Sequence, residues 1–410
     1  MNILITDYFS PGNRGDAAIV EGMISALEDE FEAPKFHMLS SFPHLCEFMH
    51  GCAGAPSLIP WMRGPVGKLR ALYLLLWARA KRAGMNLPIL SGELRETLKE
   101  YLDADIVISK GGGHITSIYG DTKYRLVSLL MAKLLGKKVV IYAQSLGPFE
   151  GSFMKWLVRC VLNRVDLITT REQESADIVE SVGVDPARVT VAADAALSMN
   201  PEGPDPSAIG QTALKDDSFE DGDRPIVTIS VREWKKHGSG VYQDYLSAIA
   251  DVADHLIQTR NCRIIFASTC TPIGGYHADD RMVACEVISR MQEDAEILWT
   301  EQSPYTLCNF LSHAELHVGT RMHSNILALL AGTPVFAIAY EHKSIGLMRQ
   351  LGMQDHCTWI DAIEPDDLIS RVEAAFNHRS ELAGAISKAL PDLARRARNI
   401  ATMVADLVRD

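Results

Sequence analysis

The chain has 410 residues, of which 47% are hydrophobic and 22% are charged, and its formal net charge is −12. This is the composition of an ordinary globular protein with ample apolar core, and the length fits two domains of about 200 residues each. The acidic balance argues against nucleic acid as a main partner. No apolar run reaches the roughly 18 residues that a membrane span needs.

The cysteines and the first residues of the chain bear on the compartment. The eight cysteines are scattered without CxxC pairs, which is typical of reduced thiols in a cytoplasmic protein, and no zinc site is indicated. Residues 1–6 form a short apolar stretch that passes at once into a glycine-rich loop, without a basic segment. We therefore expect no signal peptide and a cytoplasmic location.

The first predicted strand, residues 2–6, leads into the motif PGNRGDAAI at 11–19. Gly12 and Gly15 would let the backbone approach a ligand closely. Asp16 fits the N-cap of the helix that follows. The spacing matches neither the dinucleotide GxGxxG fingerprint nor a Walker loop, and the motif alone is equally compatible with a capped loop that holds no ligand. The polar candidates for ligand contacts in it are Asn13, Arg14 and Asp16.

Residues 69–82, LRALYLLLWARAKR, predict an amphipathic helix with basic residues at both ends. A core helix is the interpretation that this composition favours. The functional alternative is a surface that rests against a membrane or a lipid-linked substrate.

Four further apolar runs in the first half predict strands of a parallel α/β domain, at 105–109, 139–143, 167–170 and 189–191. The loops after these strands are polar or rich in glycine, and ligands collect at this end of such sheets. Three glycines directly after a strand suggest a close approach of the backbone to a ligand. The candidates from these loops are Gly112, Gly113, His114, Gln144, Ser145 and Arg171.

Residues 201–224 are rich in Pro, Gly and Asp and lack periodicity, so we interpret them as an interdomain connection. A second α/β series follows. Its apolar runs predict strands at 226–231, 263–267, 297–299 and 358–360, with helices between them. The first of these strands ends in Arg232.

The stretch 316–344 predicts one βαβ unit, with a strand at 316–318, a helix at 321–331 and a strand at 335–339. The two strands should then be parallel and the crossover right-handed. Their carboxyl ends meet at one edge of the sheet, where ligands bind in proteins of this class.

Four polar side chains follow these two strands. Arg321 and His323 come after the first, and His342 and Lys343 after the second. The helix N-terminus between them favours anions through its free N–H groups and its dipole. Each side chain alone would more often be structural, but together they favour a binding site. The sequence therefore predicts an anion site that contains a proton donor.

Two Rossmann-like parallel α/β domains facing each other across a cleft resemble the GT-B architecture of glycosyltransferases. We expect the N-terminal domain to take the acceptor and the C-terminal domain to hold the donor anion. The predicted boundaries are 1–200 for the first domain, 201–224 for the linker, 225–385 for the second domain and 386–410 for a C-terminal helix.

Four motifs resemble those of the polysaccharide pyruvyl transferases: GNRGDAAI, GGGH, QSLGPF and GTRMHSNILALLAGTPVFAIAYEHKS. The chain looks most similar to the colanic-acid type, because STCTPIGGYHADDRMVA also looks alike. The resemblance implies phosphoenolpyruvate as the donor and a sugar of a lipid-linked exopolysaccharide intermediate as the acceptor. It implies that Arg321, His323 and Lys343 belong to the active site, with Arg171 or Arg232 beside them.

Pyruvate ketal formation explains these residue types. The methylene carbon of the donor takes a proton, one sugar hydroxyl attacks C2, phosphate leaves, and a second hydroxyl closes the ring. His323 is the predicted general acid. Arg321 suits bidentate contact with the donor anion and Lys343 a point contact. This scheme needs no metal ion and no cofactor.

Some roles are open at this stage. Asp16 or Glu233 could act as the base for the acceptor hydroxyl, and Ser324 and His342 are further expected substrate contacts. His342 also competes with His323 for the role of acid. We expect the protein at the inner face of the cell membrane if its acceptor is lipid-linked, and the sequence does not predict an oligomeric state.

Two other functions fit the same residues. A GT-B glycosyltransferase with a nucleotide-sugar donor would hold a diphosphate at the same helix, with Glu341 gripping the ribose hydroxyls. A catalytically silent homologue could act as a scaffold in a polysaccharide assembly complex. The intact set of Arg321, His323 and Lys343 argues against the scaffold.

Overall fold

The computed structural model describes residues 1–89, 91–118, 120–207, 224–234 and 239–409. Most of the predicted linker, residues 208–223, lies outside this described part of the chain. Within it, no helix is long and apolar enough to cross a membrane.

The chain divides into two compact units, each made of more than one segment. The first comprises Met1–Pro11, Ile19–Met199 and Ala394–Asp410, and the second comprises Gly12–Ala18 and Asn200–Leu393. The GNRGD motif therefore belongs to the second unit, although it lies near the start of the chain.

The first unit is built on an eight-stranded sheet in which all the paired strands are parallel. The strand order is β3 (Ala53–Pro56), β2 (Lys35–Ser40), β1 (Asn2–Tyr8), β4 (Ile106–Ser109), β6 (Lys138–Leu146), β7 (Leu167–Thr170) and β8 (Val189–Val191), with β5 (Gly112–Ile115) paired to β6. The central strands β4 and β6 are mostly apolar and almost wholly buried, as a parallel sheet covered on both faces requires.

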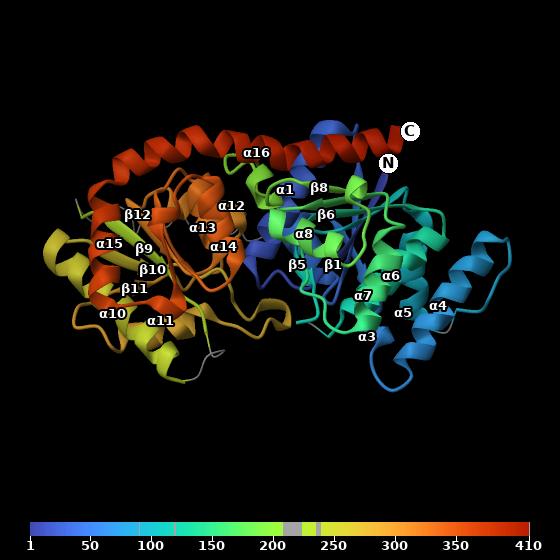
Figure 1. The fold of residues 1–410 in the computed structure, drawn as a ribbon, viewed down its shortest axis with the longest axis horizontal. Helices are drawn as coiled ribbons and strands as arrows, with labels where there is room; N and C mark the ends of the chain where they lie inside the picture. Colours follow the sequence, from blue (N-terminus) through green and yellow to red (C-terminus); the bar gives the residue numbers. More distant parts are fainter. Residues whose placement is uncertain (90, 119, 208–223, 235–238, 410) are drawn as a thin grey trace. The chain divides into compact units, whose positions relative to one another are not determined.

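Helices alternate with these strands along the chain (Figure 1). They are α1 (Arg14–Glu30), α2 (His44–His50), α3 (Leu58–Met62), α4 (Gly67–Arg82), α5 (Gly92–Asp103), α6 (Thr122–Leu134), α7 (Ser152–Leu162) and α8 (Gln173–Ser181). The first residues of α1 belong to the second unit and the rest to the first.

The second unit has a six-stranded sheet, again with every pair parallel. Its order is β11 (Glu296–Ile297), β10 (Arg263–Phe266), β9 (Ile226–Ser230), β12 (Leu316–Gly319), β13 (Val335–Ala339) and β14 (Cys357–Trp359). Its helices are α10 (Ser239–Arg260), α11 (Asp280–Ile288), α12 (Pro304–Leu311), α13 (Met322–Leu330), α14 (His342–Gln350), α15 (Pro365–Asn377) and α16 (Arg379–Arg409), the last of which continues into the first unit. The prediction of two Rossmann-like parallel α/β units is confirmed.

Three local expectations were wrong. Gly112–Ile115 is not a loop but a short strand, β5, because it pairs with β6. Strand β6 runs to Leu146, so Gln144 and Ser145 lie inside it rather than after it. Helix α1 begins at Arg14, which moves Asp16 from the N-cap into the first turn. The cap is the Asn13 side chain, whose oxygen accepts from the backbone N–H groups of Gly15 and Asp16 at 3.0 and 3.4 Å.

The strand orders fix where polar loops can meet. In the first unit the order reverses between β1 and β4, and in the second between β9 and β12. In open parallel sheets a crevice forms outside the carboxyl ends of the strands at such a switch point. Each unit therefore offers one position where its loops can hold a ligand.

Candidate active site

Three cationic side chains follow three neighbouring strands of the second unit. Arg232 comes after β9, Arg321 after β12 and Lys343 after β13, and these strands are adjacent in the sheet. Two of the three flank the switch point between β9 and β12. The predicted clustering of cations at the strand ends is therefore present, and Arg232 belongs to it.

Two of these cations lie against the aromatic ring of Tyr340. The guanidinium of Arg232 is 3.8 Å from the centre of this ring, and the ammonium of Lys343 is 5.6 Å from it. Trp234 packs beside the same ring, with 5.2 Å between the centroids. The face of an aromatic ring attracts cations, so the tyrosine holds both charges near one position. Lys343 also pairs with Glu341 at 2.8 Å.

Arg321 is held by a buried carboxylate. Its guanidinium makes two hydrogen bonds to Asp280, at 2.6 and 3.1 Å, and Asp280 is almost fully buried. Burial raises the pKa of the Asp280 carboxyl, against the opposing effect of Arg321 and, more weakly, of Arg232. Arg321 is therefore fixed in place, and its charge is largely balanced by its partner.

His323 lies in the first turn of α13, against the GNRGD loop. A β-carbon on Gly15 would lie 2.4 Å from Nδ1 of the imidazole. A β-carbon on Gly12 would lie 2.4 Å from the carbonyl oxygen of Ile273. The protein itself thus fills the space beside both glycines. At Gly15 the backbone lies directly against the imidazole of His323.

The loop is anchored by Arg14, which is 1% exposed. Its guanidinium donates to the carboxylate of Glu301, to the carbonyl of Gln302 and to the hydroxyl of Thr271. Its backbone N–H donates to the carbonyl of Thr269 at 2.8 Å, which completes a short antiparallel bridge. The loop residues are therefore part of the wall around His323.

Two other predicted contacts of the second unit lie differently. Ser324 is buried, and its hydroxyl bonds to Ser230 and His317 inside the unit. Burial also lowers the pKa of His317 to about 3, so this network is neutral. His342 is exposed at the start of α14 and packs edge-on against Trp359, with 5.1 Å between the ring centres.

The predicted residues of the first unit also come together. Gln144 donates to the hydroxyl of Ser109 and to the carbonyl of Lys110, both at 2.7 Å, and lies 3.2 Å from Nε2 of His114. Its buried Oε1 has no hydrogen-bond partner among the described residues. These contacts join the ends of β4, β5 and β6 into one polar network.

Arg171 is almost fully buried beside this network. It donates to Ser145 at 2.7 Å and pairs with Asp194 at 2.6 Å. A β-carbon on Gly113 would lie 3.6 Å from its guanidinium, and Gly112 has the left-handed φ of +133° that favours glycine. The GGGH glycines thus let the strand end turn and approach Arg171.

Asp7 is the central charge of the first unit. It lies at the end of β1, with its carboxylate 2.7 Å from both Arg125 and the hydroxyl of Ser109. Burial alone would raise its pKa, but Arg125, His114 and Ser109 together lower the pKa to about 2. Its φ of +70° is a left-handed conformation that is uncommon for a residue with a side chain. An ionised, strained aspartate at a switch point is typical of a functional site.

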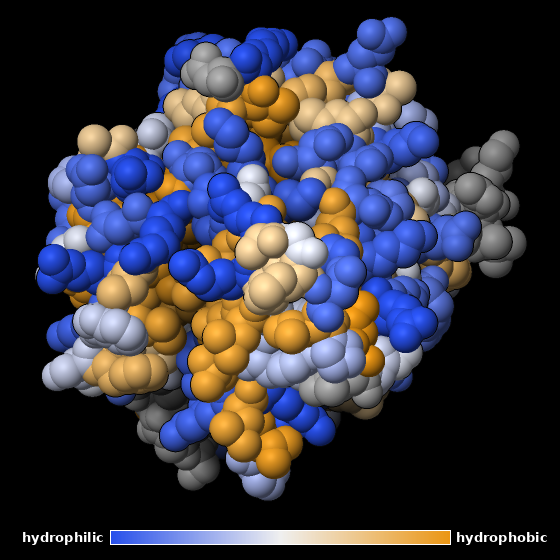
Figure 2. All heavy atoms as spheres, turned by 90° about the vertical axis from the view of Figure 1, so that its right-hand side faces the viewer, coloured by the Kyte–Doolittle hydropathy of each residue, from blue (hydrophilic) through white to orange (hydrophobic). Residues whose placement is uncertain are grey.

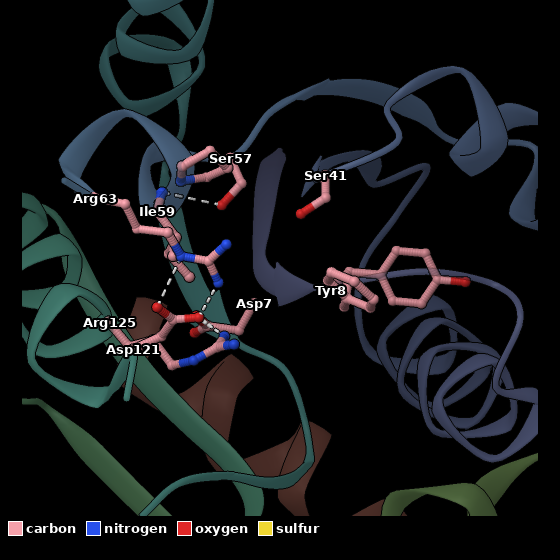
Figure 3. Close-up of a pocket in the computed structure, with 10 residues that line it drawn as sticks. Asp7, Tyr8, Ser41, Ser57, Ile59, Arg63, Asp121 and Arg125 are labelled. Carbon is pink, nitrogen blue, oxygen red and sulfur yellow. Dashed lines mark hydrogen bonds and ion pairs between the residues drawn. The ribbon is translucent and has the colours of Figure 1, made fainter. Parts of the chain in front are cut away.

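A pocket opens beside Asp7, at the carboxyl ends of β1, β2 and β3. Figure 3 shows Arg63, Asp121, Asp7 and Arg125 close together in it, joined by two ion pairs. The buried Nε of Arg125 has no acceptor among the described residues. The residues that line the pocket are Asp7, Tyr8, Phe9, Ser41, Ser57, Ile59, Pro60, Arg63, Asp121 and Arg125.

Sequence reasoning missed the partners that hold the predicted residues. Asp280 and Tyr340 are examples in the second unit, and Asp7 and Arg125 in the first. Two of them had a readable signal, because Asp7 follows the first strand directly and Tyr340 follows β13. Nothing in the spacing of the sequence pairs Asp280 with Arg321, which lies 41 positions further along.

Two parallel α/β units, each with a polar site at its switch point, define a GT-B-type fold, and solved structures of this class match the whole chain. The UDP-GlcNAc 2-epimerase of Neisseria meningitidis, bound to UDP-GlcNAc, is 12% identical with a TM-score of 0.61 over all of both chains. Anabaena HepE, in complex with UDP and glucose, is 14% identical with a TM-score of 0.56, again over all of both chains.

The family follows from the sequence. A family model of polysaccharide pyruvyl transferases matches residues 13–342, so the chain belongs to the polysaccharide pyruvyl transferase family. The amylovoran biosynthesis protein AmsJ of Erwinia amylovora is 28% identical over 405 residues, which is 95% of each chain. The family makes the protein a transferase, and the predicted resemblance is confirmed at this level.

The contact between Gly15 and His323 gives a first prediction. Gly15→Ala should displace the imidazole by a few tenths of an ångström or more, and a misplacement of about 1 Å can lower turnover roughly 100-fold. The displacement can be followed in the NMR signals of His323, and turnover in a transfer assay. Gly384→Ala in α16 is the matched control, because no atom lies within 4 Å of its added β-carbon. Unchanged His323 signals and turnover in Gly15→Ala would contradict the contact.

Proposed function

We propose that the protein transfers pyruvate from phosphoenolpyruvate to two hydroxyls of a sugar in a lipid-linked exopolysaccharide intermediate, at the inner face of the membrane, and releases phosphate. One observation carries the proposal: three cations at adjacent strand ends of one unit, with His323 in the first turn of the helix between two of them. Membership of the pyruvyl transferase family and the similarity to a protein of amylovoran biosynthesis support it. An acceptor of the colanic-acid kind fits the same resemblance.

The cations suit a donor with two anionic groups. Phosphoenolpyruvate carries a carboxylate and a phosphate on neighbouring atoms, and both need charged hydrogen-bond donors once they are out of water. Arg232 and Lys343 are half-buried and lie on one aromatic ring, so they can turn toward a ligand. Arg321 already donates to Asp280 through Nε and Nη2, so the ligand would be contacted by its remaining Nη1 from a fixed position. The same charges stabilise phosphate as it leaves.

The proton comes from His323. In the first step its proton moves to C3 of the donor, so that the methylene carbon becomes a methyl group and the C2–C3 bond becomes single, while a sugar hydroxyl bonds to C2 and releases its proton to solvent. In the second step the C2–O bond to phosphate breaks, a second hydroxyl of the sugar bonds to C2 and closes the ketal, and its proton leaves with the phosphate. The enol phosphate does not accept the sugar hydroxyl at C2 until C3 is protonated, so the acid controls the rate.

The pocket beside Asp7 suits the acceptor. It combines an exposed aromatic face on Phe9 with hydroxyls, two arginines and two carboxylates. Sugars present the same mixture, with apolar C–H faces and ring hydroxyls that both donate and accept. Because its pKa is near 2, Asp7 stays ionised at neutral pH and accepts from a sugar hydroxyl without competing for its proton.

The decisive test of the function is a transfer assay. The protein is incubated with phosphoenolpyruvate and a panel of galactosyl, glucosyl and mannosyl acceptors in an excess of chelator, and mass gain and phosphate release are measured. We expect transfer to survive the chelator, because side-chain cations hold the donor. His323→Gln should bind the donor normally and lose about 10²–10⁴-fold in turnover, the usual scale for a general acid.

His342→Gln is the matched control for this variant, since it removes an imidazole on the next strand-end loop. An inactive His342→Gln beside an active His323→Gln would reverse the two roles. Thermal stabilisation by UDP or GDP, without a response to phosphoenolpyruvate, would favour a nucleotide-sugar glycosyltransferase instead.

Donor binding separates the three cations. Arg232→Ala and Lys343→Ala should each raise the dissociation constant for phosphoenolpyruvate about 10–100-fold, the scale of a lost hydrogen bond to a charged group, with little change in thermal stability. Arg321→Ala should instead lower the free energy of unfolding by about 3–5 kcal/mol, because it leaves Asp280 buried without its partner. Titration calorimetry and denaturant unfolding measure the two effects. Lys343→Arg keeps the charge and should retain most of the affinity. Normal donor binding in both Arg232→Ala and Lys343→Ala would move the anion site elsewhere.

The acceptor pocket is tested apart from the donor site. Arg63→Gln removes an exposed pocket cation that pairs with Asp121, so the KM of the acceptor should rise about 5–10-fold while donor affinity stays unchanged. Arg188→Gln removes a similarly exposed arginine of the same unit, outside the pocket, as a control. An equal change in both variants would show that the pocket does not take the acceptor.

A further inference from the structure

Helix α4 presents an apolar stripe to solvent. Leu69, Leu72 and Leu76 are 68%, 54% and 53% exposed, and their spacing of three and four residues puts them on one side of the helix. On the other side, Leu74 and Trp77 are buried in the core of the first unit. Helix α4 therefore has two apolar sides. The described part of the first unit covers the side with Leu74 and Trp77, and it leaves the leucine stripe exposed.

Helix α7, which also packs against α6, carries two large exposed aromatic side chains. Phe153 is 66% and Trp156 57% exposed, and their ring centres lie 5.9 Å apart. Helix α6 packs against both α4 and α7, and the face of the molecule drawn in Figure 2 has apolar side chains gathered in its lower half among polar ones. We call the exposed apolar side chains of these two helices on either side of α6 the α4–α7 face and define it by Leu69, Leu72, Leu76, Phe153 and Trp156.

The helices around this face are basic. Helices α4, α6 and α7 contain no Asp or Glu, in a chain whose net charge is −12. Lys68 and Arg79 lie beside the leucine stripe and Lys155 beside the aromatic pair. All three are exposed and make no ion pair with any residue that the structure describes. The basic residues of the three helices are Lys68, Arg70, Arg79, Lys81, Arg82, Lys123, Arg125, Lys133, Lys155 and Arg159.

We infer that the α4–α7 face docks on a lipid bilayer that contains anionic lipids. Exposed leucine and aromatic side chains beside lysine and arginine, on helices that themselves contain no Asp or Glu, are the features of helices that lie in the headgroup region. Each basic residue near such a surface adds to binding through the negative potential of the bilayer. This docking would bring the enzyme to the proposed lipid-linked acceptor, and in that respect the inference rests on the proposed function. The binding itself does not depend on it.

The same charges make a second copy of the chain an unfavourable partner for the α4–α7 face. A two-fold symmetric dimer would bring the same patch of both subunits together. The cations of one α4 would then face those of the other without an acidic partner, and such like-charge contacts are unfavourable. A bilayer surface has the complementary sign.

The electrostatic part is tested by sedimentation with vesicles. The wild-type protein should bind vesicles of phosphatidylcholine with about one-third phosphatidylglycerol, and bind pure phosphatidylcholine much less. Lys68→Gln/Arg79→Gln should weaken binding to the anionic vesicles about 25-fold, from about fivefold for each cation. Lys35→Gln/Lys388→Gln is the control, because it removes two exposed lysines outside the face and changes the net charge equally.

The apolar part is tested with Leu69→Gln/Leu76→Gln. Glutamine is a good helix former, and both side chains point outward, so thermal stability should stay unchanged. Vesicle binding should fall about tenfold or more. Met282→Gln/Trp299→Gln removes two exposed apolar side chains of the second unit as the matched control and should bind as the wild type does.

Three results would overturn the inference: a wild-type protein that does not bind the anionic vesicles, variants of the face that bind as well as their controls, or a wild-type dimer that Leu69→Gln/Leu76→Gln dissociates. The variants should also transfer pyruvate to a water-soluble acceptor at the wild-type rate. Vesicle binding that depends on the face, in a protein that transfers no pyruvate, would leave the docking surface standing and refute the proposed function alone.

Discussion

The burial of Arg14 is the constraint on which the surroundings of His323 depend. A guanidinium stays charged at any ordinary pH, and a buried one must be surrounded by acceptors. Glu301, Gln302 and Thr271 supply them, so the GNRGD loop cannot leave this unit without exposing a charged network that costs several kcal/mol to break. Because the loop is held, Gly15 stays against the imidazole. The position of the proposed acid is thus set by a segment more than 300 positions earlier in the chain.

Both units place charged side chains at the point where the strand order of the sheet reverses, but the central charges have opposite signs. Each sheet reverses its strand order at one place, and each places charged side chains there. In the second unit these are cations that lie on Tyr340 or pair with Asp280, which suits an anionic donor. In the first unit the central group is Asp7, a carboxylate that Arg125 and Ser109 keep ionised, which suits a ligand with hydroxyl donors. The proposed reaction, between an anionic donor and a sugar with several hydroxyls, needs one site of each kind.

The sequence predicted strand ends better than it predicted contacts. Apolar runs such as 335–339 are buried on both faces of the sheet, so their length and flanking residues locate the strand and the loop after it. Arg321, His323 and Lys343 could be named for this reason. The contact between Gly15 and His323 could not, since it joins segments far apart in the chain. Strand β5 was missed because three glycines read as a loop, and only pairing with β6 makes them a strand.

The proposed acceptor pocket and the α4–α7 face are joined by a short piece of chain. Arg63 lines the pocket, and Val66, three residues later, is exposed at the start of α4. Three residues span at most about 11 Å, which is close to the depth of about 5–10 Å at which interfacial helices lie. A sugar whose lipid tail remains in the bilayer could therefore reach the pocket while α4 rests on the surface. If the lipid had to leave the membrane instead, each buried methylene would add about 0.8 kcal/mol to the cost. For the proposed lipid-linked acceptor, the order of the elements, with the pocket residue Arg63 shortly before the docking helix, thus favours an enzyme that works on its acceptor without extracting it.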